Sequence, residues 1–218
     1  MRIHPLACGF AYAFLIEAPS GLFLFDSGSP GQQNRVLAKL RKLGRTDLKL
    51  IWISHAHYDH YGSAAALREL TGALVGVHPA DAEYLATAQS PLGTTRNQGF
   101  LFHLLQPLAN LIWPLPPTPP DFTLQDGETL ERFGLDASVF HTPGHTPGHT
   151  CLLLPDRVAL AGDLIGRSPC LRPQCLLATD WSQIPGSMRR FKAAQPAWTY
   201  TGHTRRPIQG RVLQKIHS

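Results

Sequence analysis

The sequence has few cysteines and no long apolar run, and each shortage argues against a class of protein. Four of the 218 residues are cysteine (Cys8, Cys151, Cys170, Cys175), and no two stand in a Cys-x-x-Cys pair. So few cysteines in a chain of this length predict reduced thiols and no disulfide framework. No apolar stretch reaches the ~18 residues that a membrane span needs, and the first residues resemble a strand and a turn more than a signal peptide. We therefore expect a soluble cytoplasmic protein without a membrane span.

Charge is also scarce, and acidic residues are absent from one end of the chain. Charged residues make up 16% of the sequence and hydrophobic ones 43%, which predicts a single folded domain over residues 1–218. After Asp180 there is no acidic residue, but seven of the 20 basic ones lie there, which leaves the first 180 residues with a net charge of −2. A solvated basic surface explains this asymmetry, and so does a rim that attracts an anionic substrate.

The hydrophobic pattern predicts an α/β protein with mixed sheets under helices. A hairpin is expected at 10–28, followed by a helix that Ser29 caps and Gly44 ends. The other expected helices are 63–70, 80–86 and 187–194. The other expected strands are 48–54, 73–78, 122–124, 128–133, 136–141, 150–154, 158–163 and 197–203.

Residues 89–120 interrupt this alternation. Seven of these 32 residues are proline, and between the prolines lies the apolar stretch FLFHLLQPLANLIW. A segment of this length between regular elements is usually functional or disordered. We weigh two structures for it: a helix that packs into the core, and a lid over the active site.

The stretch SHAHYDHYG contains four candidate metal ligands at the end of an apolar strand. His55 and His57, two residues apart, can bind one ion from the same side, whereas Asp59 and His60 can bind a second. Imidazole nitrogens and carboxylate oxygens suit Zn²⁺, and also Mn²⁺ or Fe²⁺. The cluster therefore predicts a metal site.

Further ligand types follow other predicted strands. Asp163 and His203 each lie just past an apolar strand, where α/β sheets present functional groups. Asp163 is interpreted as a carboxylate that bridges two metals. Residues 141–149 read HTPGHTPGH, and their prolines and glycines predict a loop, which leaves open which of its three histidines binds metal.

Together, the His-x-His-x-Asp-His motif, the HTPGHTPGH loop, the AGD at 161–163 and the final Gly-His resemble the metallo-β-lactamase superfamily, in particular its glyoxalase-II-like and lactonase-like dinuclear hydrolases. The resemblance implies a four-layer αβ/βα sandwich with two divalent metals, most simply Zn, at one edge of the two sheets. It assigns His145 to the first metal with His55 and His57. Asp59, His60 and His203 then bind the second metal, and Asp163 lies between the two.

The resemblance also implies hydrolysis of an ester, thioester or lactone by a hydroxide that the two metals share, with Asp59 orienting it. The basic residue expected after the Gly-Asp of glyoxalase II makes Arg172 a candidate for substrate binding. Arg205 and Arg206 are further candidates, because they closely follow His203 and could bind an anionic small molecule.

Two alternatives remain within the same fold. A mononuclear-iron persulfide dioxygenase shares the histidine pattern. A nucleic-acid phosphodiesterase would use the basic end of the chain, but it is disfavoured because such enzymes lack the Thr-Pro-Gly-His-Thr loop. The oligomeric state is left open.

Overall fold

Two β-sheets face each other, and helices cover their outer sides. The computed structural model describes residues 1–167 and 171–217, so Cys170 falls outside the described part. The first sheet has the strand order β1 (Arg2–Cys8), β2 (Ala11–Ala18), β3 (Gly21–Phe25), β4 (Leu48–Trp52), β5 (Leu74–Val77) and β7 (Phe122–Thr123). The second has the order β15 (Ile208–Gln209), β14 (Trp198–Tyr200), β10 (Val158–Leu160), β9 (Thr150–Leu154) and β8 (Ser138–His141).

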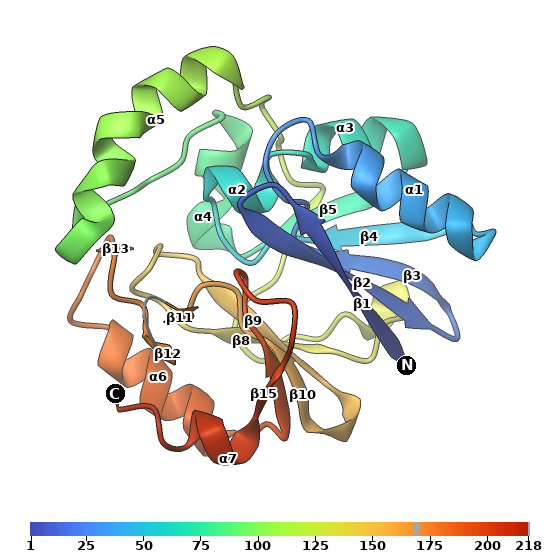
Figure 1. Ribbon diagram of the computed structural model, residues 1–218. Helices are drawn as coiled ribbons and strands as arrows, with labels where there is room; N and C mark the ends of the chain where they lie inside the picture. Colours follow the sequence, from blue (N-terminus) through green and yellow to red (C-terminus); the bar gives the residue numbers. More distant parts are fainter. Residues whose placement is uncertain (168–170, 218) are drawn as a thin grey trace.

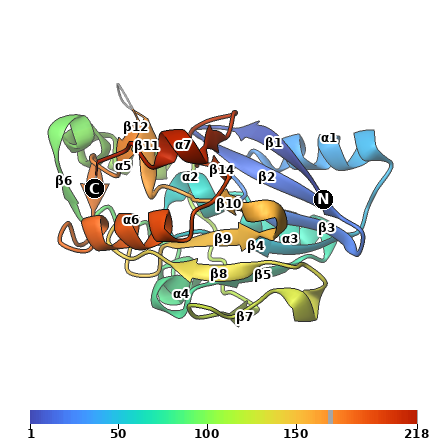
Figure 2. The same ribbon diagram turned by 90° about the horizontal axis from the view of Figure 1, so that it is seen from below.

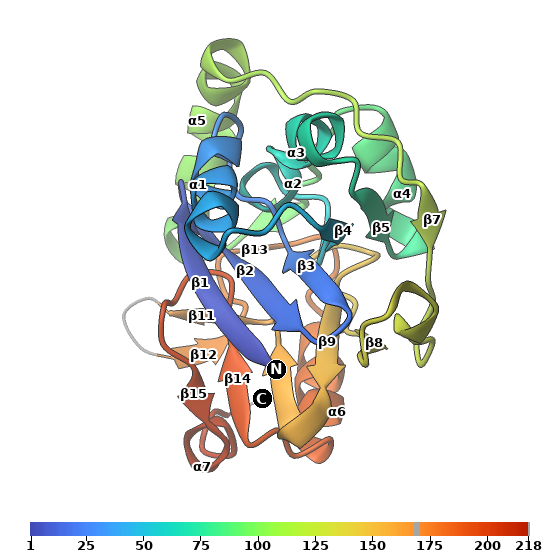
Figure 3. The ribbon, with the colours of Figure 1, turned by 90° about the vertical axis from the view of Figure 1, so that its right-hand side faces the viewer.

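The helices form the two outer layers (Figures 1 and 3). On the side of the first sheet are α1 (Gln33–Leu43), α3 (Ala64–Thr71) and α4 (Pro79–Ala86), with the short α2 (Tyr58–Tyr61) at its edge. On the side of the second are α6 (Ile184–Ala193) and α7 (Gly210–Leu213). The αβ/βα sandwich implied by the sequence is therefore confirmed.

The core consists of three apolar clusters, which lie between the layers. On β2, Phe14 and Ile16 enter the cluster between the sheets, whereas Ala13 and Leu15 enter the cluster under the outer helices. Successive side chains of a strand point to opposite faces, so a strand that is apolar at every position belongs between two layers. The third cluster, around Met188 and other α6 residues, covers the far side of the second sheet.

Several predicted elements have different local structures. Residues 128–133 are not a strand: Glu131–Phe133 form the 3₁₀ helix η2, which ends at Gly134 with φ 93°. Ser29 does not cap the first helix, because its hydroxyl accepts a hydrogen bond from the Phe10 amide and α1 begins only at Gln33. Gly44 does end that helix in the left-handed conformation, as predicted.

Residues 89–120 form a projecting arm and not a core helix. Helix α5 (Phe100–Ile112) continues through Pro107 and follows the 3₁₀ helix η1 (Asn97–Gly99). It lies beyond α2 and α4 in Figure 1 and at the opposite end of the molecule from α1 in Figure 2. Its large apolar side chains are exposed, so the packing-helix prediction is wrong. The lid remains a prediction.

The remaining short elements lie near the base of this arm or between the larger strands. β6 (Thr94–Thr95) pairs with β13 (Leu177–Ala178), and β11 (Ile165–Arg167) pairs with β12 (Leu171–Pro173). A third 3₁₀ helix, η3 (Pro155–Arg157), links β9 to β10. In the described part of the chain, no helix has both the length and the apolar character needed to cross a membrane.

Candidate metal centre

Side chains that follow strands of both sheets meet at one edge of the sandwich. His55 and His57 follow β4, Asp163 follows β10, and His203 follows β14. The loop between β8 and β9 contributes His145. All seven residues predicted as ligands occur in three groups whose nitrogen and oxygen atoms lie within 4.8 Å of one another: His55, His57 and His145; His55, His60 and Asp163; Asp59, His60 and His203.

Asp163 lies between the two ends of the cluster. Its Oδ2 is 3.6 Å from His145 Nε2 and 3.0 Å from His203 Nε2, and its Oδ1 is 3.4 Å from His60 Nε2. At the outer end, Asp59 Oδ2 is 3.7 Å from His203 Nε2 and 3.9 Å from His60 Nε2. One carboxylate thus has an oxygen within reach of both predicted metal positions.

Several atoms of the cluster lack an ordinary hydrogen-bond partner. Among the described residues, His60 Nε2 and Asp163 Oδ1 are buried without a hydrogen bond of ordinary geometry, although they lie 3.4 Å apart, and such burial is costly unless something else binds them. His145 Nε2 and His55 Nε2 lie 3.1 Å apart. Unpartnered buried donors and acceptors, in a set made only of imidazoles and carboxylates, fit divalent metal ions.

The second nitrogen of each imidazole is held by a protein oxygen, which orients the ring. Nδ1 of His55 meets Ser54 Oγ, and Nδ1 of His60 meets Asp26 Oδ2 at 2.8 Å. Nδ1 of His145 contacts the backbone oxygen of Leu177, and Nδ1 of His203 contacts the backbone oxygen of Phe10.

In His57 the roles are reversed, because its Nε2 donates to Pro91 O at 2.8 Å. We infer that His57 offers Nδ1 to a metal, whereas the other four histidines offer Nε2. Such partners fix the tautomer and raise the basicity of a ligand.

Burial and neighbouring charges determine which residues of the cluster are ionised. Burial, and then the neighbouring imidazoles, hold the pKa of His55 and His145 well below the usual value, so both rings are neutral and carry a free lone pair. The Asp163 carboxylate raises the pKa of His203 to about 9. Burial would raise the pKa of Asp163, but His203 and His60 outweigh it and hold that pKa well below its usual range. Asp163 is therefore an anion in the metal-free protein.

Gly202, which follows β14, allows the chain there to approach Asp163, which follows β10. A Cβ at Gly202 would lie 2.3 Å from Asp163 Oδ1 and 2.7 Å from His60 Cε1. Any larger residue before His203 would therefore push these ligands apart.

The three loop histidines have different surroundings. His145 points into the cluster. His149 lies behind it, where its Nε2 accepts from the Asp163 amide at 3.1 Å and its Nδ1 meets Thr142 Oγ1. His141 Nε2 donates to Pro147 O, and its ring stacks on His78 at 4.0 Å.

Sequence reasoning missed two buried carboxylates, Asp26 and Asp81. Asp26 follows β3, accepts from the Ser54 amide and hydroxyl, and binds His60. Its position just past an apolar strand was the available signal.

Asp81, at the start of α4, joins the two histidine segments. Its carboxylate accepts from the Ala56 amide at 2.9 Å, the Thr146 hydroxyl at 2.7 Å and the Gly148 amide at 2.6 Å. Nothing in its local sequence, ADAEYLA, distinguishes it from a surface helix residue.

We expect Asp81→Asn to weaken both the fold and metal binding. An amide can no longer accept at both oxygens, so at least one buried donor loses its partner, which costs about 2 kcal/mol. We expect the melting temperature to fall by about 5 °C and metal affinity by about 10-fold. Thermal unfolding and metal titration of the variant measure these effects, with the exposed Asp136→Asn as control. Equal behaviour of the two variants would show that Asp81 does not hold the loop.

The three arginines predicted to bind substrate lie outside the seven-residue cluster. Arg172 is half-buried on β12, opposite Gly166 of β11. Arg205 and Arg206 are exposed and follow His203. Their role remains a prediction.

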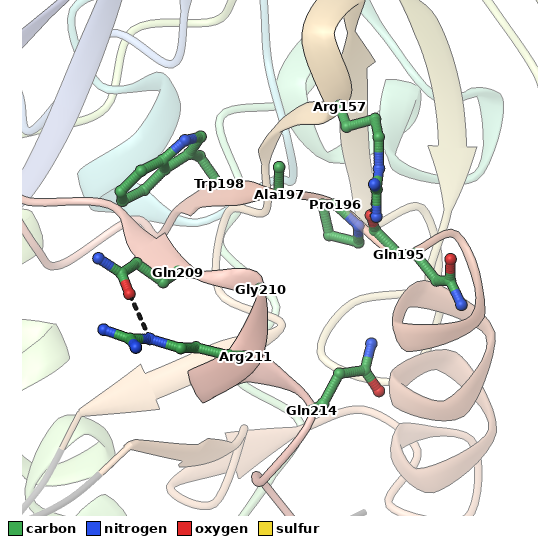
Figure 4. A pocket seen from close by; sticks show the side chains of 9 residues that line it. All are labelled: Arg157, Gln195, Pro196, Ala197, Trp198, Gln209, Gly210, Arg211 and Gln214. Atoms are coloured by element: carbon green, nitrogen blue, oxygen red, sulfur yellow. Dashed lines mark hydrogen bonds between the residues drawn. The ribbon is translucent and has the colours of Figure 1, made fainter.

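A separate hollow on the surface does not include the cluster. It has a volume of about 580 Å³ and is lined by Trp198 and other residues of the β14–β15 region, and none of the seven cluster residues lies in it (Figure 4). The guanidinium groups of Arg157 and Arg211, which border it, are bonded to Gln195 O and Gln209 Oε1. We therefore assign the chemistry to the histidine cluster.

The fold agrees with known proteins. The model of the metallo-beta-lactamase superfamily matches residues 6–203, and the chain belongs to this superfamily. A hydroxyacylglutathione hydrolase of Pseudomonas aeruginosa is 32% identical over 172 residues, which are 78% of this chain and 52% of the relative. A linear primary-alkylsulfatase of Pseudomonas sp. (strain ATCC 19151) is 28% identical over 72% of this chain and 34% of the relative. The chain thus spans about half the length, or less, of these curated relatives.

A solved structure matches the chain over nearly its whole length. The crystal structure of TTHA1623 in a di-iron-bound form has a TM-score of 0.72 and 26% identity, and the match covers 98% of each chain. A metallo-beta-lactamase family protein of Thermus thermophilus has a TM-score of 0.74 at 24% identity, over 98% of this chain and 76% of that one, which supports the fold alone. The cluster and the di-iron neighbour support divalent metals in this chain.

Proposed function

We propose that the protein is a hydrolase that uses two divalent metal ions to cleave an ester, thioester or lactone. The observation that carries this proposal is the position of Asp163, whose carboxylate reaches His145 on one side and His60 and His203 on the other. His55, His57 and His145 would hold the first ion, and Asp59, His60 and His203 the second. Nitrogen and oxygen ligands make zinc our first choice, with manganese and iron as alternatives.

Two bound divalent ions would supply an acidified water and a Lewis acid for the substrate carbonyl. Asp59 would orient the attacking water by accepting a hydrogen bond from it, since its carboxylate lies at the outer end of the cluster. His203 lies beside it, so the pair would border the face from which the substrate enters.

Nucleophilic catalysis by a side chain has less support. The Ser54 hydroxyl is committed to Asp26 and to His55. Burial raises the pKa of the Cys8 thiol to about 11 and that of Cys151 to about 12, so neither forms a thiolate near neutral pH. An attacking water fits this site better.

A panel of substrates would test the proposed activity. Thioesters, lactones, β-lactams and phosphodiesters should be offered to metal-reconstituted protein whose metal content has been counted. We expect turnover of thioesters or lactones at two ions per chain. One iron per chain with oxygen consumption on a persulfide would contradict the proposal in favour of a dioxygenase, and turnover of phosphodiesters alone would favour a phosphodiesterase.

We further propose that the substrate carries an anionic group and that the basic end of the chain binds it. The names of the two curated relatives, which refer to hydroxyacylglutathione and to alkyl sulfates, both denote anionic compounds. Arg205 and Arg206 are exposed beside His203, where a guanidinium could bind a carboxylate or sulfate through paired hydrogen bonds.

In the double variant Arg205→Gln/Arg206→Gln, we expect KM for an anionic thioester to rise about 10-fold and KM for a neutral ester to stay unchanged. Initial-rate kinetics on both substrates measure the difference. Arg211→Gln/Lys215→Gln, also at the basic end, is the matched control. A similar change for both substrates would show that these charges belong to the solvated surface only.

We also retain the lid as a proposal for residues 89–120, in which the base of the arm, and not helix α5, would cover the substrate. Its support lies at the base of the arm: Pro91 O binds His57, and β6 pairs with β13, where Leu177 O binds His145. A substrate at the metals would therefore lie near this base.

A further inference from the structure

Helix α5 exposes an apolar surface that the described part of the chain leaves uncovered. Nine large side chains at residues 100–113 are 43–80% exposed: Phe100, Leu101, Phe102, Leu104, Leu105, Leu108, Leu111, Ile112 and Trp113. At roughly 100 Å² of accessible surface for each, they present about 900 Å². The largest apolar patch on a typical monomer is about 300–600 Å². This surface is therefore large enough to need a partner.

Four of these residues follow the spacing of a coiled-coil repeat. Leucines stand at spacings of three, four and three residues, which are the a and d positions of a heptad: Leu101, Leu104, Leu108 and Leu111. Leu104 and Leu111, at the d positions, are 70% and 80% exposed. A seam of this kind packs against another helix that carries the same repeat.

The helix is attached to the rest of the protein near its beginning. His103 Nε2 donates to Gly93 O at 3.1 Å, and a Cβ at Gly99 would lie 2.0 Å from Leu176 O. Position 103 lies on a different side of the helix from the leucine seam, because it follows Leu101 by two residues and precedes Leu104 by one. The seam is therefore free to meet an outside partner.

The lack of charged residues in this segment indicates which kind of partner it can bind. Residues 97–120 contain no Lys, Arg, Asp or Glu. Interfacial helices that bind membranes combine their apolar face with a polar face rich in Lys and Arg, which α5 does not have. Two copies of an uncharged leucine seam, by contrast, can be buried together without desolvating any charge, and the exposed apolar surface of about 900 Å² per chain is of the size from which a standard interface, at ~800 Å² for each partner, can be built.

We propose that α5 is the interface of a two-fold symmetric dimer in which the leucine seam packs on the same seam of a second copy. Such an interface is isologous, so one self-complementary patch closes it and covers the seam of both copies. Because Pro91, at the base of the same arm, binds His57, the dimer also fixes the arm beside the metal centre.

Sedimentation velocity on the full chain over a wide concentration range tests this interface. We expect a species of twice the 24.0 kDa chain mass at micromolar concentration. Leu104→Lys/Leu111→Lys should convert it to single chains, because four lysines would be buried in each dimer. Leu70→Lys/Val212→Lys, which changes two exposed apolar residues elsewhere, should leave the dimer intact. Circular dichroism confirms that each variant is folded.

Three results would overturn the proposal. The first is a native chain that stays single at all concentrations and binds phosphatidylcholine vesicles, since a lipid surface would then occupy the seam. The second is a single chain that ignores vesicles but whose Leu104→Lys/Leu111→Lys variant loses turnover of long acyl esters only, which would make α5 a substrate cover. The third is a dimer that survives Leu104→Lys/Leu111→Lys.

Discussion

Asp163→Ala is expected to lower the metal content from two ions per chain to one or fewer and to reduce turnover by at least about 1,000-fold. The reason is geometric, because this carboxylate reaches the histidines of both predicted metal positions and no other carboxylate in the described part of the cluster does so. Its removal also leaves His60 and His203, whose pKa values it raises, without their counter-charge. Elemental analysis and initial rates measure the two effects.

Asp136→Ala is the matched control, because Asp136 is an exposed aspartate outside the cluster and should retain both metals and full turnover. A thermal unfolding curve for each variant separates loss of ligand from loss of fold. If Asp163→Ala kept two ions and near-native rates, the bridging role would be excluded.

The second large effect is expected at the loop histidines, where only His145→Ala should abolish metal binding at the first position. His145 Nε2 lies 3.1 Å from His55 Nε2 and 3.6 Å from Asp163 Oδ2, so it belongs to the cluster itself. His149→Ala should keep both metals but bind them about 10- to 100-fold more weakly, because the Asp163 amide loses its acceptor.

His141→Ala should be the mildest of the three changes, since the His141 ring bonds to the loop carbonyl Pro147 O and stacks on His78, outside the cluster. Metal titrations of the three variants give the order of effects. Metal loss in His149→Ala with retention in His145→Ala would reverse the assignment of the loop.

The seven side chains predicted as ligands do come together, because they lie close together in the sequence or directly after strands, and their role as ligands remains a prediction. Four of them occupy six positions, and Asp163 and His203 follow strands whose apolar runs are easy to recognise. Parallel strands bring such positions to one edge of a sheet. His145 needed more than this, because three equivalent histidines share a repeated turn, and the family resemblance chose among them.

Asp81, unlike Asp26, could not be predicted in the same way. The Asp81 carboxylate accepts hydrogen bonds from Ala56 and Thr146, which lie 25 and 65 positions away in the sequence. These contacts form only when the layers have packed. The strand expected at 128–133 was wrong for a similar reason: Phe133 turns to pack on Phe122 at 4.2 Å, a contact that outweighs the local strand preference.

The central claim, two ions acting together on one carbonyl substrate, is tested most directly by a metal titration of activity. Metal-free protein should receive increasing equivalents of zinc, with bound metal counted by mass spectrometry and turnover of a thioester measured at each step. We expect little turnover at one bound ion and a steep rise that ends at two per chain. Full turnover at one bound ion, with no gain from the second, would contradict the dinuclear mechanism.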